Sequence, residues 1–235
     1  MRIPLKTWIR YTNRLSQISQ KAADEMIGYV QRLGGYGGHV EETIQYAYAL
    51  ATKYGEAAAT AACEMYDAAA AHSGRKVPPA EPAETVSYGE TARAIQGAGR
   101  ASEQLISPTV GRLVKQAAAD TTLQNAARDR SEFAWVPRGD TCAFCMMLAS
   151  RGWQKISRKA LRNGHAEHIH AHCNCEYAVR FDGESTVEGY DPEEYLAIYN
   201  NADGDTWQEK VNSMRRDIYA ARKNSLSGGT SGTIG

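Results

Sequence analysis

Residues 142–145 read Cys-Ala-Phe-Cys and residues 170–175 read His-Ala-His-Cys-Asn-Cys, so four of the chain's five cysteines stand in two close pairs. Two thiolates three residues apart can bind one tetrahedral metal ion at about 2.3 Å each, and zinc favours such ligand sets. The second pair is tighter, and both of its sulfurs reach one ion only if the backbone turns there. The sequence leaves open whether four cysteines or three cysteines and a histidine bind the zinc (Zn²⁺). The candidate ligands are Cys142, Cys145, His170, Cys173 and Cys175.

The ligand set predicts a structural rather than a catalytic zinc, because catalytic zinc keeps three protein ligands and an open position. Residues 132–136 and 176–181, just outside the two motifs, are short and rich in aromatic and β-branched side chains, as strands are. We therefore expect two antiparallel strands whose common end is held by the metal. Zinc binding would then supply folding energy that so small a pair of strands lacks.

Two other chemistries use the same cysteines. Thioredoxin-like oxidoreductases place Cys-x-x-Cys at the start of a helix after a strand, with Thr141 here as the N-cap, but they give no role to the second motif. A disulfide framework needs an oxidising compartment, whereas the chain begins with no apolar signal segment and would leave Cys63 unpaired. We expect reduced thiols, with Cys63 as a small buried hydrophobic residue.

Four histidines, at positions 165, 168, 170 and 172, crowd one stretch and raise the alternative of a zinc-dependent nuclease of the His-Asn-His type. Residues 167–171 match the strand motif of such enzymes only loosely and lack its proline. No Gly-rich phosphate loop, serine nucleophile elbow or paired-carboxylate motif is present elsewhere. The sequence therefore predicts a protein that is not an enzyme, with the nuclease and then the oxidoreductase as alternatives.

The N-terminal part of the chain is helical by its period. Apolar residues at intervals of three and four predict one helix over about 6–33, stopped by Gly34, and a second over about 40–72. We expect a long antiparallel hairpin with arms of roughly 40 to 50 Å. Such a hairpin is either a plain core element or an arm whose alanine-rich face contacts a partner or a second copy of the chain.

The remaining segments give a mainly α (α+β) fold with a small zinc-stapled two-stranded β subdomain. Prolines mark a linker, and helices are expected over about 88–104 and over 107–129, the latter capped by Ser107. Further helices are expected over 142–150, from Ser157 to Gly164, after Asp191-Pro192, and over 206–223 with Trp207 facing inward. The expected organisation is a helical hairpin (1–73), a linker (74–86), a helical segment (87–130), the zinc-binding subdomain with C-terminal helices (131–224) and a flexible tail (225–235).

Charge is balanced overall but uneven locally. The formal net charge is zero, so the whole molecule is not an electrostatic nucleic-acid binder. Residues 151–162 are basic without an acid, and residues 182–205 hold eight acids without a base. Each run is either solvated surface or a partner contact. No apolar stretch is long enough to span a membrane.

Residues 135–152 together with residues 170–175 resemble the minor head proteins of tailed bacteriophages that are similar to the Mu F head morphogenesis protein, especially those of actinobacteriophages. The family motif is Cys-x-x-Cys, a variable loop and His-x-x-Cys-x-Cys before a strand, and all five ligand positions match. Ala171 replaces a frequent proline, and Asn174 replaces the usual arginine.

The resemblance implies a structural virion protein, present inside the head and in the host cytoplasm during assembly, that aids head assembly or DNA packaging. Its implied partners are the portal or the major capsid protein, or a second copy of itself. A contact of basic patches with packaged DNA is a further expectation, and no membrane partner is expected.

Overall fold

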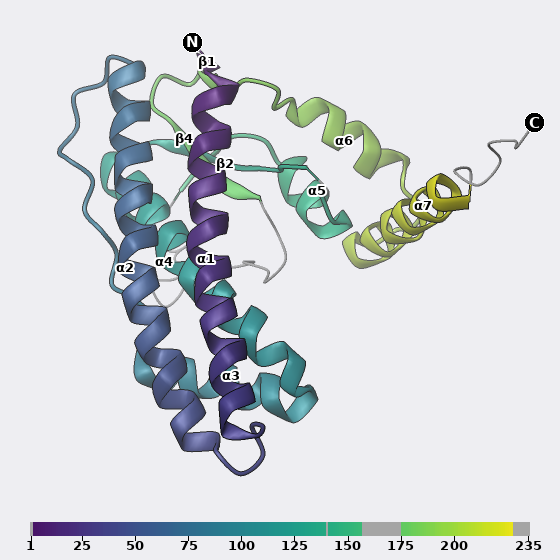
Figure 1. The fold of residues 1–235 in the computed structure, drawn as a ribbon. Helices are drawn as coiled ribbons and strands as arrows, with labels where there is room; N and C mark the ends of the chain where they lie inside the picture. Colours follow the sequence, from purple (N-terminus) through teal and green to yellow (C-terminus); the bar gives the residue numbers. More distant parts are fainter. Residues whose placement is uncertain (1, 140, 157–174, 228–235) are drawn as a thin grey trace, which may run out of the picture.

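The computed structural model describes residues 2–139, 141–156 and 175–227 (Figure 1). These residues are mainly helical, with a few short strands, as the sequence predicts. Three long helices form the body of the molecule, and a small sheet packs against one of them and also contacts a second. The last two helices lie to one side of this body (Figure 1).

Helices α1 (Leu5–Leu33) and α2 (Val40–His72) form the expected antiparallel hairpin, and α4 (Ile106–Asp129) packs against both (Figure 1). Five alanines of α2, at positions 47, 58, 61, 62 and 69, lie in the same buried cluster as apolar side chains of α1 and α4. Their small size lets neighbouring helices approach closely. Of the two alternatives left open by the sequence, the structure favours the plain core hairpin, because α4 of the same chain packs against both of its arms.

The helix ends follow local signals in the sequence. Gly34 adopts a left-handed conformation (φ 78°) that closes α1, with its N–H and that of Gly35 bonded to carbonyls of the last turn. Helix α3 (Tyr88–Ala101) begins with a reciprocal capping box between Ser87 and Glu90. A 3-10 turn, η1 (Glu103–Leu105), then joins α3 to α4.

The start of α4 corrects one prediction. Ser107 does not cap the helix, which begins one residue earlier at Ile106. Its hydroxyl instead donates a hydrogen bond to the carbonyl oxygen of Ala23 in α1, at 2.7 Å. This buried bond between α1 and α4 satisfies a polar group that would otherwise lose its contact with water on folding.

A three-stranded antiparallel sheet has the order β3-β2-β4, with β2 at Glu132–Val136, β3 at Gln154–Lys155 and β4 at Glu176–Arg180. The predicted pairing of β2 with β4 is confirmed, whereas β3 was not predicted. Glu132 lies opposite Arg180, whose Nε donates a hydrogen bond of 2.6 Å to Glu132 Oε2. The sheet packs on α4, so its inner face joins the helical core.

A second, two-residue strand pair ties the N-terminus to the C-terminal half of the chain. Strand β1 (Arg2–Ile3) runs parallel to β5 (Thr186–Val187), and the N–H of Glu188 bonds to the carbonyl oxygen of Ile3 at 3.0 Å. The backbone N–H of Leu5 donates to Glu188 Oε2 at 2.8 Å. Residues separated by more than 180 positions therefore share one hydrogen-bonded segment.

Helices α5 (Ala143–Ala149), α6 (Pro192–Asn201) and α7 (Trp207–Ser227) complete the described chain. Asp191 caps α6 as predicted, with its side chain accepting from the N–H of Glu193. Trp207 is 49% exposed, so the expectation that it faces inward is wrong. Helix α7 also continues through Ser227, into the segment expected to be a flexible tail, and the helix predicted from Ser157 to Gly164 lies outside the described residues.

Within the described ranges, no helix combines the length and apolar character that crossing a membrane requires.

Candidate metal centre

The Cys-x-x-Cys motif forms the beginning of α5. Cys142 is the N-cap and is exposed, whereas Cys145, in the first turn, is fully buried. Side chains at the N-cap and three residues later lie on the same side of a helix start, as they do in a capping box. Thr141 is not the cap that the sequence predicts, because its hydroxyl donates to the carbonyl oxygen of Gly139 at 3.1 Å.

Cys175 directly precedes β4 and lies at the end of the sheet from which the chain runs on to α5. Val136 pairs with Glu176, so one step further along the ladder Cys175 comes opposite the end of β2. Cys145 and Cys175 belong to one cluster of buried side chains, together with Trp135 and Tyr177. The strand pairing and the start of α5 thus bring a cysteine from each of the two motifs into the same small core.

Arg138 fixes the loop between β2 and α5. Its guanidinium donates to the hydroxyl of Thr12, at 2.9 Å, and to Oδ1 of Asn13, both in α1. This contact holds the loop that leads to Cys142 against the helical core. Arg138 lies within residues 135–152, which carry the family resemblance, but its role depends on a contact across 125 residues that no local pattern indicates.

A tyrosine just before α6 is hydrogen-bonded to the end of α5, and another lies within α6. Tyr190 donates its hydroxyl to the carbonyl oxygen of Ala149, at the end of α5, over 2.8 Å. Burial raises the pKa of Tyr195, and the negative charges of Cys175 and Glu194 raise the pKa further. Tyr195 therefore lies within electrostatic reach of Cys175, and sequence reasoning missed it because tyrosine is not a zinc ligand in the expected set.

The described residues contain part of the predicted ligand set. His170 and Cys173 lie outside them. Among residues 2–139, 141–156 and 175–227, no three His, Cys, Asp or Glu side chains are grouped closely enough to hold a metal ion. The thiol chemistry of Cys142, Cys145 and Cys175 suits zinc, and any complete site needs donors from residues 157–174. The zinc site stays a prediction.

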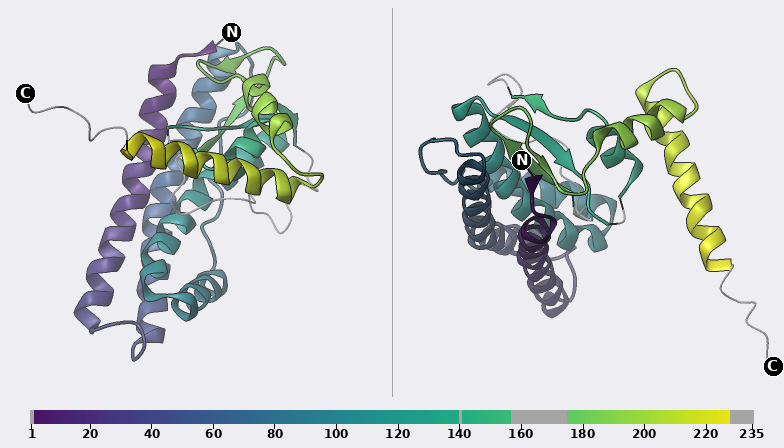
Figure 2. Two further views of the ribbon diagram at one scale, coloured as in Figure 1. Left: turned by 90° about the vertical axis from the view of Figure 1, so that its right-hand side faces the viewer. Right: turned by 90° about the horizontal axis from the view of Figure 1, so that it is seen from above.

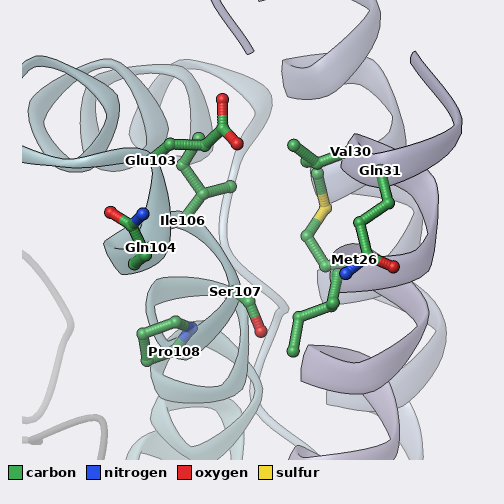
Figure 3. A pocket seen from close by; sticks show the side chains of 9 residues that line it. Met26, Val30, Gln31, Glu103, Gln104, Ile106, Ser107 and Pro108 are labelled. Carbon is green, nitrogen blue, oxygen red and sulfur yellow. The ribbon is translucent and has the colours of Figure 1, made fainter. Parts of the chain in front are cut away.

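Two hollows in the surface have a different character. One, of about 340 Å³, lies between α1 and the η1–α4 corner (Figure 3). In this close-up, Met26 and Val30 face the corner that carries Ile106 and Pro108. Glu103 is the one ionisable side chain among its lining residues, so it offers no pair of groups for acid–base chemistry.

The other hollow is a groove of about 380 Å³ between the beginning of α5 and the outer part of α7. Phe144, Ile218 and Tyr219 give it an apolar floor, and Arg215 and Arg222 add positive charge. It lies next to the exposed Cys142, which is itself one of the lining residues. The groove therefore connects the cysteine motif with α7, most of whose side chains are exposed.

Comparison with known proteins adds one family. A family model described as VG15 protein matches residues 2–202, which include the helical core, the sheet and α6. No curated protein and no solved structure matches the chain.

Proposed function

The chain belongs to the VG15 protein family, whose membership indicates a phage-encoded protein, and from that premise we propose that it is a structural component of the phage head. In this proposal it is a minor head protein that associates with the portal or the inner capsid wall. It aids head assembly or DNA packaging. It is not an enzyme in this proposal, and its C-terminal half is held by a structural zinc.

The observation that supports the proposal concerns one cysteine from each motif, at one end of a short antiparallel ladder. Cys145 and Cys175 are buried in the same cluster, although 29 residues separate them in the chain. A metal there would close the long loop between the motifs, at an entropic cost that grows only with the logarithm of its length. Such a metal clip would stabilise the fold and would take no part in a chemical reaction.

Which residues would hold the zinc follows from the motif. Cys142 and Cys145 would bind from the first turn of α5, and Cys175 from the start of β4. His170 and Cys173 would supply or complete the remaining donors. When bound, the ion adds folding energy and no chemistry on a substrate.

Metal content tests the zinc clip. We expect about one zinc per chain in protein purified without chelator, and loss of that zinc in a Cys142→Ser, Cys145→Ser double variant, because each thiolate is a ligand. Cys63→Ser is the matched control, since Cys63 lies in α2 away from the motifs and should leave the zinc content unchanged. A wild-type protein that folds without metal contradicts the clip.

The location in the particle tests the head proposal separately. Heads and tails of the phage would be purified apart and their proteins quantified by mass spectrometry. We expect the protein in the heads, at a small fraction of the copy number of the major capsid protein. Abundant protein in the lysate with none in the heads contradicts the proposal, whatever the metal content.

One observation favours a second candidate function, a thiol–disulfide oxidoreductase. Cys142 is exposed and Cys145 is buried at the beginning of a helix that follows a strand, as in proteins that exchange disulfides through Cys-x-x-Cys. In that reaction the Cys142 thiolate would attack a substrate disulfide, and Cys145 would then displace the reduced substrate by forming the 142–145 disulfide. An insulin-reduction assay distinguishes the two functions, since a zinc-bound pair should give no catalysis above the dithiothreitol background.

A further inference from the structure

The outer part of α7 projects from the body of the molecule (Figure 2). Val211 and Met214 are buried, but from Arg215 to Asn224 every side chain is exposed except Ile218, which is half-buried. Tyr219 is 71% exposed. Ile218 packs against the buried cluster that contains Cys145 and Cys175, and the exposed side chains around it leave a surface on which a further contact can form.

This segment, residues 215–224, is also strongly basic. It carries four basic side chains and one acid, which gives a net charge of +3 (four minus one). Arg215, Ile218, Tyr219 and Arg222 recur at intervals of three and four and line the groove of about 380 Å³ beside α5. The surface therefore combines an apolar strip with positive charge. We call residues 215–224 the basic arm.

A surface of opposite character lies on α6 and the loops on either side of it. All eight acids between residues 182 and 205 are exposed, and none of them forms an ion pair with a described residue. Helix α6 has no buried side chain, and Ile198 is 45% exposed. Ile198 follows Glu194 by four residues, so an apolar side chain and an acid share one face of the helix. We call residues 191–201 the acidic face.

The two surfaces cannot meet within one chain. Lys210, near the beginning of α7, donates from Nζ to the carbonyl oxygens of Asn200 and Ala202 at the end of α6, at 3.2 and 2.9 Å. This contact fixes the first turns of α7 beside the end of α6. The basic arm lies further along α7 and runs away from α6 and its acids (Figure 2). Its charge is therefore presented outward.

We propose that the basic arm of one copy docks on the acidic face of a second copy. The apolar side chains of the arm, Ile218 and Tyr219, then cover Ile198, and the arginines face the glutamates of the first turn of α6. Charge complementarity between two surfaces of the same chain selects this occupant, because each surface is matched in sign and in apolar content by the other. A nucleic acid matches the charge of the arm but not that of the acidic face, so it would leave the second surface without a partner.

The symmetry of the contact follows from its two unlike surfaces. An interface between different patches is heterologous, so each copy keeps one unused arm and one unused face. Repetition of the contact closes into a ring if the rotation allows it and otherwise forms an open chain. The proposal concerns α7 and α6 alone and does not depend on the zinc or on a place in the head.

The test uses the full chain and two charge-reversed variants, with mass measured by sedimentation velocity over a range of protein concentrations. Arg215→Glu, Arg216→Glu reverses the arm, and Glu193→Arg, Glu194→Arg reverses the face. We expect the wild-type protein to associate, more weakly in about 500 mM than in about 50 mM salt, because screening weakens exposed charge pairs. Each variant alone should dissociate about tenfold more readily.

Mixing the two variants makes the test specific. In the mixture the basic arm of one variant meets the acidic face of the other, so we expect association to return toward the wild-type level. Lys21→Glu, Lys76→Glu is the control, with two exposed lysines elsewhere changed to acids. A wild-type protein that is monomeric throughout, variants that associate like wild type, or a monomer that binds duplex DNA through the arm would each overturn the proposal.

Discussion

Asp182 organises the turn between β4 and β5. Its Oδ1 accepts hydrogen bonds from the N–H of Ser185 at 2.7 Å and from that of Glu184 at 3.1 Å, and Oδ2 accepts from the Ser185 hydroxyl. Burial by itself raises the pKa of Asp182, but these hydrogen bonds outweigh it and lower the pKa to about 2. The ionised form of this carboxyl is therefore the one that the fold stabilises.

The pH dependence of this contribution has a definite sign. Because the folded-state pKa lies below the value of about 3.8 for the unfolded chain, the stabilisation is complete above pH 3.8 and is lost as the pH falls toward 2. Asp182 is exposed, so after allowance for solvent screening we expect about 1 kcal/mol. Asp182→Asn should lower the free energy of unfolding by that amount at pH 7 and by less at pH 2.5, measured by urea titration. Glu184→Gln is the control, and an equal loss at both pH values contradicts this origin.

At two polar residues the predicted role was wrong. Ser107 and Thr141 have the right identity for N-caps, but their hydroxyls bond to the carbonyl oxygens of Ala23 and Gly139 instead. Serine and threonine hydroxyls bond any carbonyl within reach, so the identity of a residue does not choose its partner. The choice at Ser107 depends on where α1 lies, which is a tertiary fact.

At the scale of elements, α1 and α4 approach each other closely at Gly111. A Cβ at this position would lie 3.3 Å from the backbone oxygen of Ser19, which cannot move as a side-chain end can. We expect Gly111→Leu to reduce the free energy of unfolding by about 3 kcal/mol, because overpacking forces the two helices apart. Gly97→Ala, on an open face of α3, should instead stabilise by up to about 1 kcal/mol through helix propensity. Chemical denaturation of both variants checks the pair, and equal effects contradict the packing argument.

The capping box of α3 gives a second prediction at this scale. The Ser87 hydroxyl accepts from the N–H of Glu90, and the Glu90 carboxylate accepts from the N–H of Ser87 at 2.9 Å. We expect Ser87→Ala to cost about 1 kcal/mol in the free energy of unfolding, since it leaves a helix N–H without its partner. Ser87→Asp should retain most of the stability, because aspartate also caps helices. A thermal melt distinguishes the two variants, and similar losses in both would count against the cap.

The ends of a helix or strand were predictable where glycine or proline residues next to it in the sequence mark them. Helix α2 runs from Val40 to His72 as predicted, because a glycine-rich loop precedes it and a glycine and proline-rich segment follows it. The β2–β4 pair was predictable from its composition and from the cysteines beside it. Strand β3 and the β1–β5 pair were not, because two-residue strands leave no periodic signal and owe their existence to distant partners.

At the scale of the whole molecule, the sheet and the helices share one core. Side chains of β2 and β4 belong to the same buried cluster as those of α1, α2 and α4. Loss of the proposed zinc should therefore lower the midpoint of a single cooperative transition rather than melt the sheet alone. We expect circular dichroism and tryptophan fluorescence to give coincident melting curves with and without a chelator, the chelated curve lying lower. Two separate transitions contradict a shared core.

Part of the candidate site could likewise be predicted from the sequence and part could not. The cysteine motifs identified the candidate ligands, and the structure shows Cys145 and Cys175 in one buried cluster. The sequence could not show that Arg138 anchors the loop to α1 or that Tyr195 lies within electrostatic reach of Cys175. Both interactions join residues that are not neighbours in the chain, and no local pattern encodes them.

The short pairing of β1 with β5 has a consequence for the order of events during synthesis. Arg2 and Ile3 pair with Thr186 and Val187, so β1 is synthesised long before the strand that it pairs with. The hairpin and α4 can assemble earlier, because their contacts close sooner along the chain. Residues 2–3 can therefore form their strand pair only after residues 186–187 have been translated.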